Sequence, residues 1–432
     1  MRRKIKQKLL VLGTVLVAVV FLGQGCGGLE PPEDDADNLP KFELVYWSVF
    51  NNSEDVNEII NAYRLNNPNV TIEYKKLEID EYEDELIDAL ASGRGPDIFS
   101  IHHSWLPRYT DKLEPLPVSQ VPLAEYVPVV EKATVLNDMC YGLPYSVDTL
   151  ALFYNPKLLS SASVPSPPTT WDEFDQAVKQ LVLRDDRQEF IREGAAMGAV
   201  NNVNRGIDPL LLLMTQNGAQ IINAENTEAT FADSIVGDDN IRYSPGLAAL
   251  NKYMDYSRST SSVYTWNNQL PNAFDEFASS KLGMFFNYAF NLEKTEELLT
   301  ADEVRVAEAP QVDPDNPTAY ASLWLEGVST KSESQLEAWK FILFATGLEG
   351  AKLYVDATNR PSSRIDVLDV QKSDRRIGPF ARQAFYADIW YQENPQAFEA
   401  VFADMVNSIV NGERSRENAL QQAEIQVTNL LK

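Results

Sequence analysis

The sequence is rich in carboxylates and poor in the side chains that most often act as nucleophiles or metal ligands. Its 432 residues include 63 Asp and Glu but two His and two Cys. It contains no HExxH, GxSxG or GxxxxGK[ST] pattern, and the segment DPDNP lacks the glycine and downstream glutamate of a calcium loop. We therefore predict a protein that binds a ligand without being an enzyme, and we expect no cofactor and no metal. A carboxylate pair that hydrolyses glycans stays the catalytic alternative.

Both histidines follow the apolar stretch DIFSI. His102 and His103 precede Trp105, so three ring side chains come at the end of one predicted strand. Ligands in open α/β sheets bind beyond the carboxyl ends of the strands, which makes His102 and His103 candidates for ligand contact. Adjacent residues of an extended chain point to opposite faces, so the two rings cannot readily bind one ion. An isolated surface histidine is the alternative for each.

Strands that alternate with helices must position these side chains. ELVYWSVF is an apolar strand, and Val56, Ile59, Ile60 and Tyr63 recur at one-face spacing in the helix that follows. The strand VTIEY, a second helix and the strand DIFSI continue the alternation. This order predicts an α/β fold with a doubly wound, mostly parallel sheet, and the length predicts two lobes.

The second half of the chain reads as mostly helical. A capping box at Thr170 and Glu173 begins one helix, because each residue can bond the other's backbone N–H. The pattern stays helical to about Leu299, apart from the aromatic strand KLGMFFNYAF. ASLWLEGVST is a further strand, and helices are expected around 336–345, 398–410 and 419–431.

The N-terminus has the layout of an export signal. Residues 2–8 are basic, Leu9–Leu22 is apolar, and Gly23-Gln24-Gly25 precede Cys26. A cysteine after small residues resembles a bacterial lipoprotein lipobox, which predicts a signal peptide over 1–25 and lipidation of Cys26. An uncleaved anchor helix is the alternative. Residues 26–40 are Gly-, Pro- and acid-rich and predict a flexible linker. The localisation expected is the outer face of the cell membrane, or its periplasmic side.

The net charge of −26 argues against nucleic acid and against direct electrostatic binding to an anionic leaflet, since both would repel the chain. The membrane contact that remains is the N-terminal lipid. We expect a monomer.

Four segments in order resemble the large bacterial extracellular solute-binding proteins, the family that includes maltose-binding proteins. They are the strand with Trp47 followed by NNPNVTIEY, then ALASGRGPDIFSI, then YGLPYSVDTLALFYNPKLL with PPTTWDEFDQAVKQL, and finally FDEFASSKLGMFFNYAF. The resemblance covers the chain from Phe42 onward. It implies a periplasmic-binding-protein-like fold with two hinged α/β lobes and a ligand cleft between them. The N-terminal lobe is expected at 41–149 plus 323–366, and the C-terminal lobe at 150–322 plus 367–432.

The resemblance also implies which side chains contact the ligand. A sugar needs flat aromatic faces together with amide, carboxylate or guanidinium groups. The candidates, besides the two histidines, are Trp47, Asn51, Tyr145, Asp148, Trp266, Tyr288, Phe290, Trp324 and Arg360. Core packing is the alternative for Trp47, turn capping for Asp148, and an ordinary surface position for Arg360.

The implied function is capture of a small organic solute, most readily a sugar or oligosaccharide, for the permease subunits of an ABC importer. A surface protein that feeds a sensor or acts as a lectin is the alternative outside transport.

Overall fold

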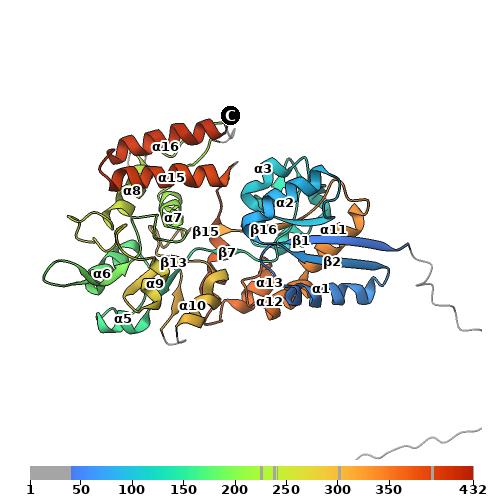
Figure 1. Ribbon diagram of the computed structural model, residues 1–432, viewed down its shortest axis with the longest axis horizontal. Coiled ribbons are helices and arrows are strands. Elements are labelled where there is room, and N and C mark those ends of the chain that lie inside the picture. The colour runs from blue at the N-terminus through green and yellow to red at the C-terminus, as the bar shows by residue number, and fades with distance from the viewer. Residues whose placement is uncertain are drawn as a thin grey trace, which may run out of the picture. The chain divides into compact units, whose positions relative to one another are not determined.

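The computed structural model describes residues 40–223, 227–236, 240, 242–299, 303–390 and 394–431. The predicted signal peptide over 1–25, Cys26 and the predicted linker as far as residue 39 lie outside these residues. From Lys41 onward the chain forms one compact unit, in which two α/β lobes surround separate cores (Figure 1). Among the described helices, none is long and apolar enough to cross a membrane.

The N-terminal lobe is built on a four-stranded sheet in the order β16–β3–β1–β2. Strand β1 pairs in parallel with β2 and β3, and β16 pairs antiparallel with β3. The mostly parallel sheet expected from the sequence is confirmed here. The strands are β1 (Phe42–Ser48), β2 (Val70–Lys76), β3 (Ile98–His102) and β16 (Trp324–Val328). The main helices are α1 (Ser53–Asn66), α2 (Ile79–Ala91), α4 (Pro128–Thr134), α11 (Gln335–Ala345), α12 (Leu348–Thr358) and α13 (Ile365–Gln371).

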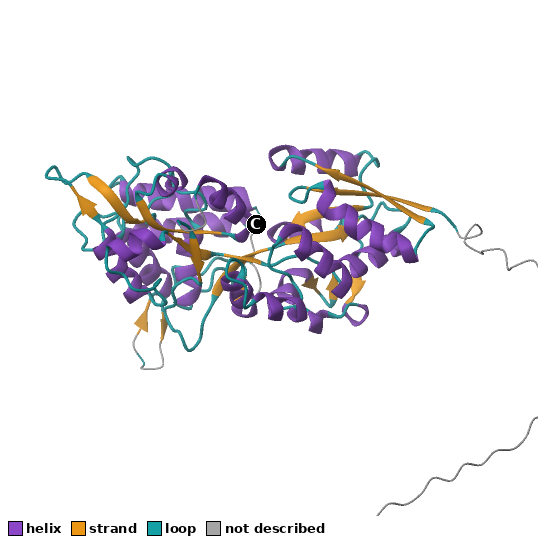
Figure 2. Ribbon diagram, turned by 90° about the horizontal axis from the view of Figure 1, so that it is seen from below, coloured by secondary structure: helices purple, strands orange, loops and turns teal. Residues whose placement is uncertain are grey.

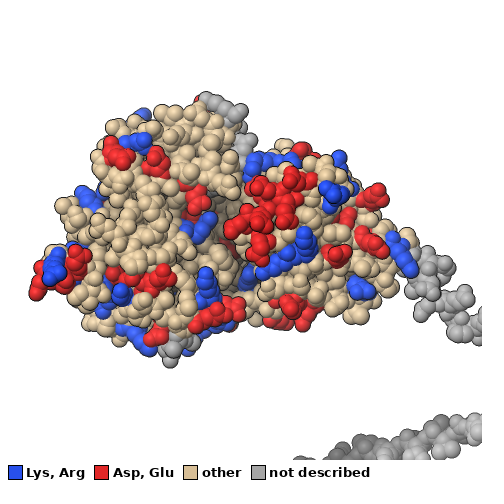
Figure 3. Space-filling model, viewed as in Figure 1, with Lys and Arg blue, Asp and Glu red and all other residues tan. Residues whose placement is uncertain are grey.

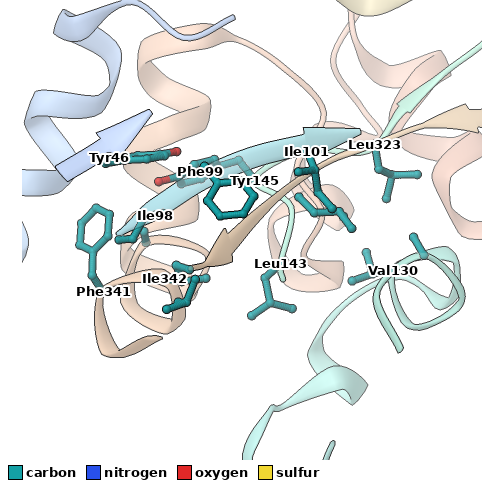
Figure 4. Close-up of a cluster of buried hydrophobic side chains, with 14 of the residues drawn as sticks. Tyr46, Ile98, Phe99, Ile101, Val130, Leu143, Tyr145, Leu323, Phe341 and Ile342 are labelled. Carbon is teal, nitrogen blue, oxygen red and sulfur yellow. The ribbon is translucent and has the colours of Figure 1, made fainter. Parts of the chain in front are cut away.

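Helix α1 forms where the apolar spacing predicts it. Its buried residues are Val56, Ile59, Ile60 and Tyr63, and the Asp55 carboxylate accepts the backbone N–H of Asn52 at its start (3.0 Å). Figure 4 shows side chains of β3 and α11 meeting in the core of this lobe, with Leu143, Tyr145 and Leu323 beside them. Cys140 is buried there and forms no disulfide.

The C-terminal lobe holds a five-stranded sheet in the order β14–β8–β13–β10–β9. One of its four pairings, β10 with β13, is parallel, and the other three are antiparallel. The mostly parallel arrangement expected from the sequence is therefore wrong for this lobe. Strand β8 continues the first crossing from the N-terminal lobe, and the direction of that crossing runs it against both β13 and β14. The strands are β8 (Ala151–Tyr154), β9 (Leu183–Arg184), β10 (Phe190–Ala195), β13 (Leu282–Asn287) and β14 (Arg305–Ala307).

Helices cover both faces of this sheet. The helices of this lobe are α5 (Pro156–Ser161), α6 (Trp171–Leu181), α7 (Asp208–Gln216), α8 (Pro245–Asp255), α9 (Ala273–Ala278), α10 (Leu292–Leu298), α14 (Gly378–Gln383), α15 (Pro395–Val410) and α16 (Arg416–Leu430). At the start of α6, Thr170 accepts the N–H of Glu173 as predicted (3.2 Å). The Glu173 carboxylate, however, accepts the N–H of Thr169 (2.8 Å), one residue before the predicted partner. The prediction missed the paired strands β9 and β10 in this region.

Three chain crossings join the lobes. Strand β15 (Ala319–Ser322) pairs antiparallel with β7 (Asp148–Thr149) and parallel with β17 (Ala387–Asp388), and Figure 2 shows strands running through the narrow middle of the body. The core to which the chain contributes changes at each crossing, for example between Tyr320 and Ala321. Segment 365–389 contributes to both lobes, since Leu368 packs in the N-terminal core and Phe380 in the C-terminal core.

Candidate functional site

A cleft between the lobes contains three adjoining chambers. The outer chamber has a volume of about 490 Å³, the inner chamber about 70 Å³ and the side chamber about 280 Å³. Figure 3 shows the surface hollowed between the two lobes. Phe50, from the loop after β1, and Phe290, from the turn Ala289–Asn291 before α10, line all three chambers.

Aromatic rings dominate the wall of the outer chamber. The ring of Trp324 packs edge-on against Phe50 (centroids 4.9 Å apart) and against Trp105 (5.2 Å). Trp324 begins β16 and Trp105 follows β3, so both come from the end of the N-terminal sheet where the two strands pair. The C-terminal lobe adds further aromatic residues, which are Tyr288, Tyr320, Trp390 and Phe398.

A polar group lies beside these rings on the C-terminal side of the outer chamber. Arg205 pairs with Asp208 (Nε to Oδ2, 2.8 Å), and the Tyr288 hydroxyl donates to the same carboxylate oxygen (2.6 Å). Arg205 has a left-handed backbone (φ 56°), which is rare for a residue with a side chain. The Asp208 carboxylate is buried whereas the Arg205 guanidinium is partly exposed, so this guanidinium is available to a ligand hydroxyl.

Both histidines line the outer chamber. The His102 ring lies 2.6 Å from Ser104 Oγ through Nδ1 and 3.0 Å from Ser322 Oγ through Nε2. His103 Nδ1 contacts the backbone of Leu323 (3.3 Å). Burial lowers the pKa of His103 to about 4 and that of His102 well below its usual value. Both rings are therefore neutral at neutral pH and can serve as hydrogen-bonding groups.

The inner chamber is lined by polar groups of the N-terminal sheet. Glu326 on β16 lies opposite Ser100 on β3, and the Ser100 hydroxyl donates to Glu326 Oε2 (2.6 Å). Burial raises the pKa of Glu326 to about 7, so a protonated, neutral carboxyl can donate a hydrogen bond into the chamber below that pH. Sequence reasoning missed Glu326 because it lies within the apolar segment WLEGV.

Asn51, Tyr354 and Arg360 form a second polar edge of this chamber. The Tyr354 hydroxyl donates to Asn51 Oδ1 (3.1 Å), and Arg360 Nη1 contacts the same oxygen (3.3 Å). The Tyr354 ring stacks on Tyr145 with centroids 4.8 Å apart. Asn51 and the segment that holds Tyr354 and Arg360 are about 300 residues apart in the sequence, yet they present an amide and a guanidinium to one small space.

Asp148 lies on the crossing strand β7 and also lines the inner chamber. Its carboxylate accepts the backbone N–H groups of Ala289 (2.7 Å) and Phe290 (3.0 Å). Burial raises the pKa of Asp148 to about 6, against the lowering effect of these hydrogen bonds. The turn-capping alternative considered for Asp148 is therefore present in the structure, and it fixes the turn that carries Phe290.

Nine of the eleven predicted contact residues line the outer or the inner chamber. They are Asn51, His102, His103, Tyr145, Asp148, Tyr288, Phe290, Trp324 and Arg360. Trp47 and Trp266 are not among the described residues that line the chambers. Trp47 packs beside the N-terminal core with Lys75 Nζ 4.7 Å from its ring centroid. Trp266 is fully buried in the C-terminal lobe, where its indole N–H donates to Asn202 (3.0 Å).

The lining residues that the prediction lacked include Phe50, Arg205, Asp208, Glu326 and Trp390. Phe50 directly precedes the predicted Asn51, so the end of the first strand was the available signal. Arg205 lies in the loop after β10, and Asp208 is the first residue of α7. The sequence carried no signal for them, because the prediction had missed β10. Among the described residues, no group of three or more His, Cys, Asp or Glu side chains is arranged to hold a metal ion.

Comparison with known proteins gives a family and a set of relatives. The family described as bacterial extracellular solute-binding protein matches residues 58–378. A maltotriose-binding protein of Pyrococcus abyssi is 29% identical over 104 residues, which are 23% of this chain and 22% of that protein. A galactooligosaccharide-binding protein of Bacillus subtilis is 23% identical over 164 residues, 38% of this chain and 39% of that protein. The matches thus span well under half the length of these curated relatives.

Solved structures match over nearly the whole body. A solute-binding protein of an ABC transporter from Thermotoga lettingae, bound with α-D-tagatose, has a TM-score of 0.69 and 21% identity, covering 91% of this chain and 100% of that one. The sugar-binding protein MalE from Xanthomonas citri has a TM-score of 0.75 and 18% identity, covering 90% and 97%. The predicted two-lobed α/β fold is confirmed by these likenesses.

Proposed function

The chain belongs to the bacterial extracellular solute-binding protein family, and we propose that it captures a small saccharide between its lobes for an ABC-type importer. The observation that carries the proposal is the outer chamber, where aromatic faces and polar groups line one space. Its volume of about 490 Å³ falls within the roughly 300–1,000 Å³ of small-ligand sites. Two relatives whose names state that they bind oligosaccharides support the choice of ligand class.

The chemistry of the walls fits a neutral sugar. Trp324, Trp105 and Phe290 can cover the apolar C–H faces of sugar rings. Hydroxyls at the ring edges can accept from the Arg205 guanidinium and can donate to carboxylate oxygens, which is the pairing that orients a ligand in a mostly apolar site. Closure of the lobes then follows from the greater affinity of the closed state for the ligand.

We propose that the moving halves are 41–149 plus 323–366 and 150–322 plus 367–432, with segment 365–389 forming part of the hinge. The division of the buried residues into separate cores supports the boundary near residue 149 and the one near residue 322. Beyond residue 366, Leu368, Ala381 and Ala384 still pack in the N-terminal core, which is why this segment is assigned to the hinge. We also propose that the protein is exported, that lipid on Cys26 holds it at the membrane, and that it passes its ligand to permease subunits unchanged. Replacing Cys26 with Ser should release the protein from the membrane, and recovery of intact ligand after prolonged incubation would exclude turnover.

A thermal-shift screen tests the ligand class. Purified protein is heated with mono- and oligosaccharides, and with peptides and polyamines as controls. A ligand at 100 times its Kd should add about 2.7 kcal/mol to the free energy of unfolding. Stabilisation by a saccharide supports the proposal. Stabilisation by a peptide or a polyamine, with no response to any saccharide, would overturn it.

A further inference from the structure

Phe50 and Phe290 meet across the cleft, one ring from each lobe. Their ring centroids are 6.3 Å apart and the ring planes are 27° from parallel. The outer and side chambers share these two residues and no other described lining residue. The ring pair therefore lies where the outer chamber would otherwise continue into the side chamber.

Each ring is held from behind by its own lobe. Phe50 packs against the edge of Trp324 (4.9 Å), and Phe290 stacks on Tyr288 (6.0 Å, 17°). The backbone N–H of Phe290 donates to Asp148 Oδ2 (3.0 Å), which fixes the turn on which the ring is carried. Supports of this kind hold a wall in place, whereas a freely rotating surface ring would yield to a ligand.

The side chamber differs in chemistry from the outer chamber. It is lined by Asn52, Asp55, Glu293 and Arg376, among others, and has more than half the volume of the outer chamber. It is thus large and polar enough to receive an extension of a sugar chain, and the two rings stand between it and the aromatic wall of Trp105 and Trp324.

We propose that Phe50 and Phe290 form a partition that sets the maximum length of the saccharide. This inference rests on the proposed function and deepens it. A ligand in the outer chamber ends against Phe290, which is 45% exposed. A longer saccharide is excluded, because its next sugar ring would have to occupy the position of the two phenylalanine rings. The substrates are therefore short saccharides, and removing either ring admits longer ones.

The test measures affinity against chain length by calorimetry. The probes are linear α-1,4- and β-1,4-linked saccharides of one to six units. In the wild type, affinity should rise with the number of sugar units only for the shorter saccharides and should not rise further for the longer ones. Phe50→Ala and Phe290→Ala should each raise the affinity for the next longer members at least tenfold relative to the shorter ones. The double variant should gain no more affinity for the longer saccharides than either single variant, because both rings belong to one partition.

Two control variants make the result decisive. Phe290→Trp should keep the partition, so the maximum saccharide length should stay the same or become shorter. Tyr243→Ala, at an exposed aromatic residue on β12 (Arg242–Tyr243) that lines none of the three chambers, should change nothing. If the wild type binds saccharides but both alanine variants keep its length limit, or lose affinity equally for all lengths, the partition is wrong and the proposed function stands. If no saccharide binds the wild type, the proposed function fails and the partition fails with it.

Discussion

Trp324 and Trp266 show how surroundings decide what a tryptophan contributes. Trp324 is partly exposed in the outer chamber, whereas Trp266 is fully enclosed by the C-terminal core. Trp324→Ala should weaken saccharide binding at least tenfold and should cost less stability than Trp266→Ala, because Trp324 is partly exposed. Trp266→Ala should lower the free energy of unfolding by about 3–5 kcal/mol, because it leaves a cavity. Calorimetric titration and urea unfolding measure the two effects, and equal loss of stability in both variants would contradict this assignment.

Glu193 on β10 is a buried carboxyl (1% exposed) outside the cleft. Burial, and then the charge of Glu276, raise its pKa to about 7, against about 4.3 for glutamate in an unfolded chain. The folded state therefore holds a proton that the unfolded state releases, so the stability that Glu193 contributes is complete below about pH 4 and is lost as pH rises through 7.

Glu193→Gln should remove this dependence and stabilise the protein at pH 8 by on the order of 2–3 kcal/mol. Urea unfolding at pH 5 and pH 8 measures the change. Glu189→Gln, at an exposed position just before the same strand, is the matched control and should leave the pH dependence as it is. If the free energy of unfolding of Glu193→Gln varies with pH as it does in the wild type, the Glu193 carboxyl of the wild type is ionised at no cost to stability.

Most of the site residues that sequence reasoning found, such as Trp324 and Asp148, lie at a strand end or a crossing, whereas Arg360 follows helix α12. Arg205 was missed because its role depends on a left-handed backbone and on contact with Asp208, neither of which a residue pattern reveals. Glu326 was missed because its role depends on Ser100 of the neighbouring strand, which donates a hydrogen bond to it. A single strand's sequence does not show which residue its neighbour places opposite.

At the scale of elements, the start of α6 depends on two adjacent threonines with separate tasks. Thr170 accepts the N–H of Glu173, and Thr169 donates its N–H and its hydroxyl to the Glu173 carboxylate. Thr170→Ala should cost about 1 kcal/mol, the usual loss for an N-cap. Thr169→Ala should cost less, because its backbone N–H remains. Urea unfolding of the two variants tests the order, and a larger loss for Thr169→Ala would reverse the assignment.

Helices such as α1 could be predicted because their apolar spacing is local and survives in the buried residues. Strand direction in the C-terminal sheet could not. Whether β8 runs with or against β13 depends on where the chain crosses the hinge, and the apolar pattern of a strand is the same for both directions. Local patterns therefore identify the strands, and long-range connections set their order.

At the scale of the whole molecule, one buried amide ties two crossings together. Gln383 is fully buried and accepts the N–H of Ala309 (2.7 Å), while it donates to Thr149 Oγ1 (2.9 Å) and the Leu150 carbonyl (3.1 Å). Gln383→Ala should destabilise the protein by about 1–3 kcal/mol for each polar group left unpaired. The hydrogen-exchange rates of the backbone amides should rise first around residues 147–151. Protection lost evenly over both lobes would show that Gln383 has no special role at the hinge.

The enclosed thiol of Cys140 has a practical consequence. Burial raises its pKa and keeps it from solvent, so maleimide dyes should leave it unmodified in the native state. In a Cys26→Ser background, cysteines placed at Leu65 on one lobe and Ile425 on the other, both well exposed, would carry a fluorescent donor and acceptor without competing labels. Energy transfer between them would then follow the approach of the two halves in real time, one molecule at a time.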